Sequence, residues 1–364
     1  MSKDNCPQLQ SQVQDAYINK SPLKICAGNS KHFYGYPKDG NLLDVSTHQG
    51  IISYEPTELV ITARAGTRLA DIESTLSDSN QILAFEPPYF SEIASQKNAT
   101  LKNATLGGTI ACNMSGPRRA YSGAARDFVL GCSIINGKAE KLKFGGQVMK
   151  NVAGYDASRL MCGAMGTLGI ILDVSLKVLP KPETEITLSQ QCGIHQAMDN
   201  MHQWVKQSLP VSASCYVNSQ LYIRLSGNHS SVSSAQQKIG GDVVNNDQDF
   251  WQQIKDQSHD FFKSEKSIWR LSLASSTPPL KNLNGNTLYE WGGALRWLSS
   301  NDPAEKIREL LNSVGGHATL FKNNKLNIAP FHQLSPGMLT IHKNLKQAFD
   351  PGNILNPGCM YKEF

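Results

Sequence analysis

The pattern of apolar and polar positions predicts mostly short strands in the first half of this chain. Apolar runs predict strands at residues 23–27, 42–45, 59–63 and 82–85. Leu69, Ile72 and Leu76 recur at helical spacing and predict a helix between the last two of these strands. From 171 to 179 apolar and polar residues alternate, as in a strand with one buried face. The proline-rich stretch 180–182 ends that strand, and we place a domain boundary there.

A hairpin is predicted in the middle of this region. Apolar runs at 129–135 and 139–144 flank the dipeptide Asn136-Gly137, which is typical of a tight type I′ turn between antiparallel strands. A helix is predicted over 152–161.

Beyond residue 182 short strands alternate with helices. Strands are predicted at 215–217, 221–225, 268–273, 288–298 and 319–321, and helices at 197–209, 250–261 and from Asp302-Pro303 to Gly315-Gly316. The first of these helices has Ala197, Met201, Trp204 and Val205 on its apolar face. Ser335-Pro336 begins a last helix that ends at Asp350. This region therefore predicts an antiparallel sheet covered by helices.

Composition narrows the class of protein. At 364 residues the chain has room for about two domains, and its net charge of +5 is far from the dense basic stripes of a nucleic-acid binder. No apolar segment follows the N-terminal residues, and the run 160–172 is too short and glycine-rich to span a bilayer. We therefore expect a cytoplasmic protein. Its eight cysteines include no CxxC pair, which argues against a zinc ribbon or an iron–sulfur cluster, and we predict no metal site.

Four uncharged segments of small residues are the candidates for chemistry. The sequence contains no GxGxxG after a strand, no GxxxxGK[ST], no GxSxG and no HExxH. What remains are the segments 27–31, 105–109, 113–116 and 166–170. Small residues leave backbone N–H groups accessible, so that such segments can approach a pyrophosphate closely. The alternative is that each is an ordinary tight turn.

Longer motifs carry a resemblance to a known family. They are TLGGTIACNMSG at 105–116, GAARDFVLG at 123–131, KNVAGYDASRL at 150–160, GTLGI at 166–170 and FDPGNILNPG at 349–358. Over residues 23–180 and 335–364 the chain resembles the FAD-binding lobe of the vanillyl-alcohol-oxidase-type (PCMH-type) flavoproteins. The resemblance implies an α+β fold of two lobes: an FAD-binding domain over 1–182, a smaller cap domain with an antiparallel sheet and helices over 183–334, and a C-terminal segment, 335–364, that returns to the first.

A narrower resemblance points to one branch of that family. The segments LKICAGNSK at 23–31, FYG at 33–35, FEPP at 85–88 and SGPRR at 115–119 are similar to those of FAD-binding subunits of bacterial glycolate oxidase complexes. This resemblance implies two partners, a larger FAD-containing catalytic subunit and an iron–sulfur subunit. Together they would oxidise a short 2-hydroxy acid, glycolate to glyoxylate, and pass electrons to a quinone-type acceptor at the inner membrane. The alternative is a stand-alone FAD-dependent oxidoreductase of another hydroxy acid or alcohol.

The resemblance also implies which residues contact FAD. Carried over position by position, these are Ala27, Gly28, Asn29, Ser30 and Lys31 at the pyrophosphate, Pro87 near the flavin, Gly107, Gly108, Thr109, Asn113 and Ser115 along the ADP and flavin, Gly166, Gly169 and Ile170 at the adenosine side, and Asn356 from the C-terminal segment. Arg118 and Arg119 are candidates to bind a substrate carboxylate, because a guanidinium grips a carboxylate with two hydrogen bonds. Their alternative role is an ion-paired surface, and for Arg126-Asp127 we expect a structural pair.

Two departures from the family argue against catalysis by this chain alone. Relatives that oxidise 2-hydroxy acids usually carry a GDGNxH motif in the second lobe, which is absent here, and Met165 stands where the catalytic subunit has an acidic residue. His32 is one step displaced from the position at which some members attach FAD, so we expect non-covalent FAD. No catalytic residue is assigned. His317, His332 and His342 are candidates for a base, with ordinary structural roles as the alternative.

Overall fold

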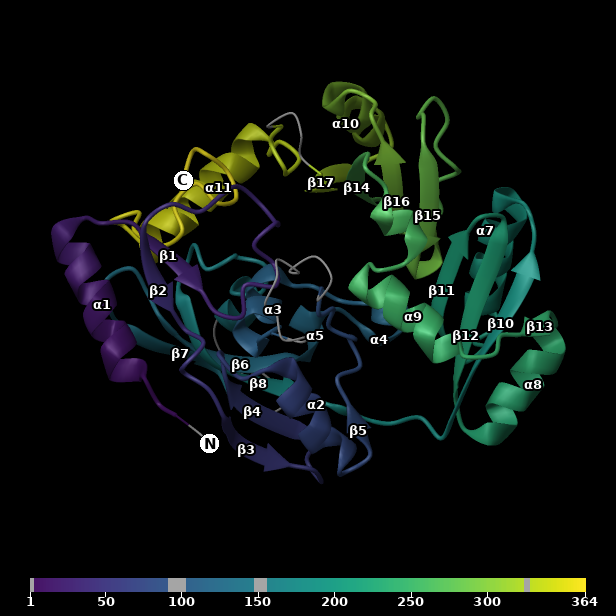
Figure 1. The fold of residues 1–364 in the computed structure, drawn as a ribbon, viewed down its shortest axis with the longest axis horizontal. Coiled ribbons are helices and arrows are strands. Elements are labelled where there is room, and N and C mark those ends of the chain that lie inside the picture. The colour runs from purple at the N-terminus through teal and green to yellow at the C-terminus, as the bar shows by residue number, and fades with distance from the viewer. Residues whose placement is uncertain (1–2, 91–102, 147–155, 324–327) are drawn as a thin grey trace. The chain divides into compact units, whose positions relative to one another are not determined.

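The computed structural model describes residues 3–90, 103–146, 156–323 and 328–364 (Figure 1). The chain divides into two compact units. Unit 1 consists of Met1–Ser115, Ala124–Pro180 and Gln333–Phe364, and unit 2 of Gly116–Gly123 and Lys181–His332. The short excursion Gly116–Gly123 packs with unit 2, although the sequence analysis places it inside the first domain.

Unit 1 is built on a five-stranded antiparallel sheet. Its strands, in spatial order, are β3 (Ile51–Glu55), β4 (Val60–Arg64), β8 (Ile170–Lys177), β6 (Val129–Ile135) and β7 (Lys141–Gly145). The alternation predicted for the central strand β8 is confirmed, because Leu172, Val174 and Leu176 all lie in the core. Ser175 on the other face is also buried, and its hydroxyl lies 2.8 Å from that of Thr62. The alternating pattern thus predicted the buried face of β8 correctly. The sequence pattern predicted no strand at the position of β3.

Smaller elements complete unit 1 around that sheet. They are the parallel pair β1 (Leu23–Cys26) and β2 (Asn41–Asp44), the short pair β5 (Gln81–Ile82) and β9 (Leu179–Pro180), and the helices α1 (Cys6–Asn19), α2 (Leu69–Ser77), α3 (Leu106–Cys112), α5 (Ala125–Phe128), α6 (Ala157–Leu160) and α11 (Pro336–Phe349). Leu69, Ile72 and Leu76 are buried on α2 as predicted. The predicted strand 82–85 is wrong beyond Ile82, and residues 152–155 of the predicted helix 152–161 lie outside the described residues.

The hairpin between β6 and β7 forms, but the predicted turn type is wrong. A type I′ turn needs positive φ at both central residues, whereas neither Asn136 nor Gly137 has one and Ala139 does, at φ 62°. The connection is longer, since Ile135 pairs with Lys141. Gly137 is needed for a different reason: a Cβ there would lie 2.2 Å from the carboxylate of Asp350. The turn is shaped by its contact with the C-terminal segment.

The segment 105–109 is also not the loop that was expected. It begins helix α3, whose first turn is capped by the Thr105 hydroxyl, which accepts from the Gly108 N–H at 3.4 Å. Glycines are poor helix formers, but Gly107 lies so close to Ala65 that a Cβ would come within 2.6 Å of the alanine side chain. Close packing against the sheet therefore explains a glycine inside this helix.

Unit 2 is an eight-stranded antiparallel sheet with helices, as predicted. The spatial order is β13 (Asp242–Val243), β10 (Thr184–Gln191), β12 (Gln220–Gly227), β11 (Val211–Val217), β15 (Asn286–Glu290), β16 (Leu295–Ser300), β14 (Ser267–Ser272) and β17 (His317–Lys322). Its helices are α4 (Arg119–Ser122), α7 (Ile194–Lys206), α8 (His229–Ile239), α9 (Asp247–Asp256) and α10 (Ala304–Ser313), with single 3₁₀ turns η1 (Asp260–Lys263) and η2 (Trp291–Gly293). The α+β class is therefore confirmed.

The apolar face of α7 differs from the prediction at one position. Ala197, Met201 and Trp204 are buried as expected, but Val205 is 54% exposed and Met198 is buried instead. The buried residues of α7, counted from Ala197, therefore lie at positions i, i+1, i+4 and i+7, the spacing of one face of a helix.

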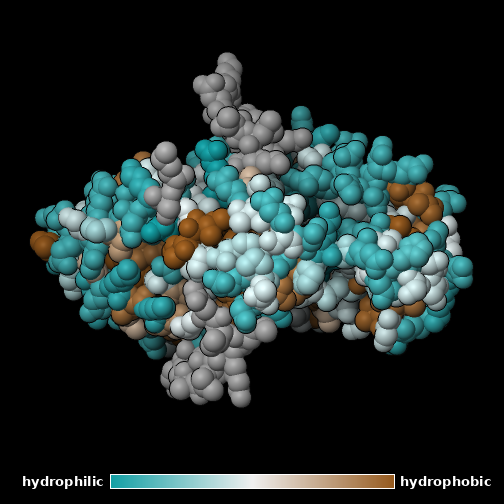
Figure 2. Space-filling view, turned by 90° about the horizontal axis from the view of Figure 1, so that it is seen from below, coloured by the Kyte–Doolittle hydropathy of each residue, from teal (hydrophilic) through white to brown (hydrophobic). Residues whose placement is uncertain are grey.

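The molecular surface that Figure 2 shows is mainly polar, with small separate apolar patches. Isolated exposed apolar residues such as Ile18 and Leu42 are ordinary features of a protein surface. Among the described helices, none combines the length and the apolar character that crossing a lipid bilayer requires.

Candidate functional site

Unit 1 contains a cavity whose empty space, open mouth included, is about 810 Å³. Most of its wall comes from four parts of the chain: β1 with the residues that follow it, helix α3, the segment leading into β8, and the C-terminal segment. Val45 and Ala65 also line it. Three of these parts belong to the small-residue segments that the sequence analysis singled out. They are far apart in sequence, and the sheet of unit 1 brings them together.

The segment 27–31 is held against the residues that precede α3. A Cβ on Gly28 would lie 1.5 Å from the carbonyl oxygen of Asn103, so a side chain there would push the two segments apart. Asn29 adopts a left-handed conformation at φ 55°, which asparagine tolerates better than most residues. Ser30 is buried at the base of the turn. Residues 27–31 all line the cavity, and a run of small residues can offer its backbone N–H groups to an anion.

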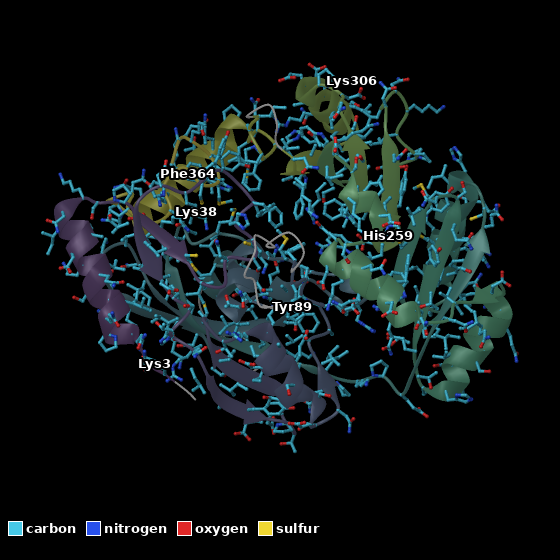
Figure 3. The ribbon with its side chains drawn as sticks, in the orientation of Figure 1. Lys3, Lys38, Tyr89, His259, Lys306 and Phe364 are labelled. Carbon is cyan, nitrogen blue, oxygen red and sulfur yellow. The ribbon has the colours of Figure 1, made fainter. Side chains whose placement is uncertain are left out.

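Two lysines line the cavity. The Lys31 ammonium donates to the hydroxyls of Ser30 and Thr109, both at 3.3 Å. Lys38, labelled in Figure 3, lies in the loop whose Tyr36 N–H donates to the carbonyl of Cys359 at 2.9 Å. Among the described residues that line the cavity, none is Asp or Glu. The wall therefore suits an anionic group.

Helix α3 contributes an open stretch of backbone. A Cβ on Gly108 would meet only the Thr105 hydroxyl, at 3.2 Å, and no other heavy atom within 4 Å. The α-carbon of Gly108 therefore faces open space in the cavity wall. A ligand can approach the helix backbone here, which a larger residue would prevent.

The thiols in the cavity wall are not prepared for nucleophilic chemistry. Burial raises the pKa of both Cys26 and Cys112 above the ordinary value of a cysteine. Both thiols are therefore protonated near neutral pH and behave as small apolar groups.

The segment 165–170 and Asn356 close another side of the cavity. Asn356 accepts from the backbone N–H of Ile25 at 2.8 Å and donates to the carbonyl of Met165 at 2.7 Å. A single buried side chain thus joins β1 to the segment that leads into β8. Gly166, with φ 76°, lies so close that a Cβ would come within 2.8 Å of the Asn356 amide.

Most residues predicted to contact the cofactor line this cavity. They are Ala27, Gly28, Asn29, Ser30, Lys31, Gly107, Gly108, Gly166, Gly169, Ile170 and Asn356. Four others, Pro87, Thr109, Asn113 and Ser115, are not among the residues that line it.

The structure gives three of those four residues other contacts. Thr109 bonds to Lys31. The side-chain amide oxygen of Asn113 accepts from the N–H of Arg126 at 3.2 Å, and the Ser115 hydroxyl accepts from the N–H of Ala125 at 2.9 Å. Asn113 and Ser115 therefore cap the start of the short helix α5. Both residue types are typical caps, but the donor N–H groups lie 13 and 10 positions further along the chain, so no local pattern predicts this role.

The candidate substrate arginines lie in unit 2 and have contacts there. Arg118 pairs with Glu185 at 2.5 Å and also donates to Ser226. Burial raises the pKa of Glu185, but Arg224 and Arg118 outweigh it and hold this pKa below its usual range. Arg119 stacks over the Trp291 ring, 4.3 Å from its centroid. A substrate carboxylate would have to compete with Glu185 for Arg118. The expected pair of Arg126 with Asp127 is present, with N and O 3.6 Å apart.

None of the three candidate bases lines the cavity. His317 and His332 belong to unit 2 and His342 to unit 1. Burial lowers the pKa of all three. His32, whose ring lies 3.0 Å from the carbonyl of Asn29, is the histidine among the described residues that line the cavity.

Sequence reasoning missed Lys38, Cys26 and Cys112 as cavity residues. Cys26 directly precedes the predicted segment 27–31, and Cys112 directly precedes the predicted segment 113–116. Their position next to these segments could have predicted that they line the cavity. Lys38 lies in an irregular loop, where no periodicity shows which way a side chain points.

The fold is that of an FAD-binding flavoprotein of the PCMH type. The family profile described as "FAD binding domain" matches residues 4–145. A solved structure of p-cresol methylhydroxylase with substrate bound superposes with a TM-score of 0.69, covering 99% of this chain and 88% of that one at 14% identity. An identity this low supports the shared fold alone.

Curated relatives narrow the class. The glycolate oxidase subunit GlcE of Escherichia coli (strain K12) is 45% identical over 360 residues, 99% of this chain and 98% of the relative. The glycolate oxidase subunit GlcD of Bacillus subtilis (strain 168) is 32% identical over 169 residues, 46% of this chain and 32% of that protein. The chain therefore belongs to the family of GlcE-type glycolate oxidase subunits, and the expected FAD-dependent oxidoreductase class is confirmed.

Proposed function

We propose that this chain is the FAD-binding subunit of a complex that oxidises glycolate to glyoxylate. Its partners are a larger FAD-containing catalytic subunit and an iron–sulfur subunit that passes electrons to a quinone-type acceptor. The chain is cytoplasmic and reaches the membrane through these partners. The observation that carries the proposal is the cavity of unit 1, whose wall combines exposed backbone, two lysines and no described acidic residue.

In this proposal the cavity residues share the work of holding FAD. The backbone N–H groups of 27–31, the Ser30 hydroxyl and the Lys31 ammonium hold the pyrophosphate, which carries two negative charges. Lys38 supplies a second positive charge in the same wall. Gly108 leaves room for close approach, and Gly166, Gly169 and Ile170 cover the adenosine side. Attachment is non-covalent, and FAD when bound supplies a two-electron acceptor.

The oxidation itself is assigned to the larger subunit. The second lobe has no GDGNxH motif, and Met165, with a buried apolar side chain, stands at the cavity wall where an acidic group is expected of a catalytic subunit. Within unit 1 the chain's residues bind and orient the cofactor, while in unit 2 Arg118 and Arg119 brace the segment 116–123 through Glu185 and Trp291.

Purification of the full chain, alone and with whatever accompanies it, tests this proposal. We expect the isolated chain to carry non-covalent FAD that denaturation releases, and iron only in fractions that contain a second protein. Glycolate added anaerobically should bleach the flavin of the complex and leave that of the isolated chain oxidised. A folded chain without FAD contradicts the cofactor assignment. Bleaching of the isolated chain favours the alternative, a stand-alone oxidoreductase.

A further inference from the structure

A buried charge cluster lies directly behind the cavity wall of unit 1. Lys346 is the buried residue of helix α11, whose other described residues are at least partly exposed. Its ammonium donates to the carboxylate of Asp350 at 2.7 Å, to the carbonyl of Leu355 at 2.8 Å and to the carbonyl of Thr167 at 2.9 Å. Its three protons are thereby matched to three acceptors.

The carboxylate of Asp350, which pairs with Lys346, also binds the backbone that follows helix α11. Asp350 is 1% exposed, and its two oxygens accept from the backbone N–H groups of Ile354 at 3.1 Å and Leu355 at 2.7 Å. These bonds set the turn after α11. The next residues pair with β1: Leu23 donates to the carbonyl of Ile354 at 2.7 Å, and Asn356 donates to that of Leu23 at 3.0 Å.

The cluster reaches the cavity through two of its contacts. Thr167, which accepts from Lys346, lies between Gly166 and Gly169, both in the cavity wall. Asn356 follows the turn that Asp350 organises and bonds to Ile25 and Met165, which also line the cavity. One short C-terminal segment thus fixes two walls of the cavity, β1 and the segment 165–170, and its Asn356 lies 331 positions beyond Ile25 in the sequence.

We propose that Lys346 and Asp350 are positioning residues for FAD: together with Asn356 they form a clamp that holds the segment 165–170 and β1 at the separation the cofactor requires. The inference rests on the proposed assignment of this cavity to FAD. Neither residue touches the cavity, so both act through Thr167 and Asn356. A buried cation with three acceptors at fixed distances allows little freedom, which suits a wall that must be preorganised.

The test compares FAD affinity with stability in the full chain. Lys346→Met keeps the length of the side chain and removes the charge, and Lys346→Met/Asp350→Leu also removes the unpaired buried carboxylate that the single variant would leave. Lys343→Met, at an exposed position of the same helix, is the matched control. We expect the double variant to melt below the wild-type temperature, because the carbonyls of Thr167 and Leu355 and the N–H groups of Ile354 and Leu355 lose their side-chain partners. At a temperature where it is still folded, we expect it to bind FAD about 10- to 100-fold more weakly, the range seen when a group that supports a metal site is removed. A folded double variant with wild-type FAD affinity would overturn the proposal.

Gly108→Trp separates this outcome from a failure of the cavity assignment. If Gly108→Trp binds FAD normally, the cavity is wrongly assigned. If it loses FAD while the Lys346 variants keep it, only the clamp fails. Should the Lys346 variants not fold, backbone hydrogen exchange of the wild-type chain decides the question. The clamp predicts that FAD slows exchange in 165–170 and 354–357 together, and slowing in 165–170 alone would contradict it.

Discussion

The polar groups at the cavity of unit 1 differ from a set of buried polar groups in unit 2. In unit 2 Arg296 is 1% exposed and donates to the carbonyls of Gly293 at 3.0 Å, Pro278 at 2.8 Å and Thr277, and Glu290 accepts from Trp297 at 2.7 Å. In unit 1 the polar groups at the cavity include two lysines and a run of accessible backbone. Internal pairing fixes a fold, whereas a cationic wall with accessible backbone prepares a surface for a ligand.

The comparison explains why Arg118 and Arg119 were predicted to bind substrate although neither of them lines the cavity. Guanidinium groups are well suited to carboxylates, and Arg118 has indeed found one, in Glu185 of its own unit. The residues at the cavity are less conspicuous in sequence, since glycine, serine and alanine are common everywhere. Their small side chains leave space for a ligand to approach the backbone, and whether that space exists depends on the residues packed around them.

Gly108→Trp should have the largest effect on the ligand surface. The indole fills the open space in front of α3, so we expect the purified chain to lose FAD, measured as the visible flavin absorbance per chain. Gly337→Trp is the control, because a Cβ at Gly337, near the start of α11, meets no atom within 4 Å and Gly337 lies outside the cavity. Equal flavin content in the two variants would show that the cavity wall at Gly108 is not a ligand surface.

Arg296→Met should have the largest effect on the internally paired unit. Its removal leaves three carbonyls without their donor, and we expect a loss of roughly 2–4 kcal/mol in the free energy of unfolding, measured by urea denaturation. FAD affinity at low temperature should change little, because Arg296 belongs to unit 2. Lys306→Met, on the exposed side of α10, is the control. A variant of wild-type stability would show that these bonds contribute nothing net.

Lys31→Met should have a smaller and more selective effect. Hydrogen bonds to charged groups contribute about 1.5–3 kcal/mol, so we expect the dissociation constant for FAD to rise roughly 10- to 100-fold. The FAD affinity of the variant should depend less on salt than that of the wild type. Riboflavin, which has no phosphate, should bind both proteins equally. Equal losses for FAD and riboflavin would mean that Lys31 shapes the wall instead of neutralising the pyrophosphate.

Local sequence patterns predicted several elements and their buried faces correctly. The alternation over 171–179 predicted the central strand with Leu172, Val174 and Leu176 in the core, and Ser335-Pro336 marked the start of α11, where the serine hydroxyl accepts from Met338 N–H. These signals are reliable because they depend on the period of the backbone and on capping within one turn. The small-residue segments likewise indicated where backbone stays accessible.

Which of these segments come together at one cavity, and which buried residues support its wall, could be read only from the tertiary structure. Asn113 and Ser115 cap a helix, Gly137 makes room for Asp350, and Lys38 joins the cavity wall. Lys346 occurs in an amphipathic helix where a lysine ordinarily faces solvent, and it is buried because Thr167 and Leu355 offer it carbonyl oxygens. Such contacts join residues far apart in sequence, and no local periodicity encodes them, because they exist only after the sheet and the C-terminal segment have packed.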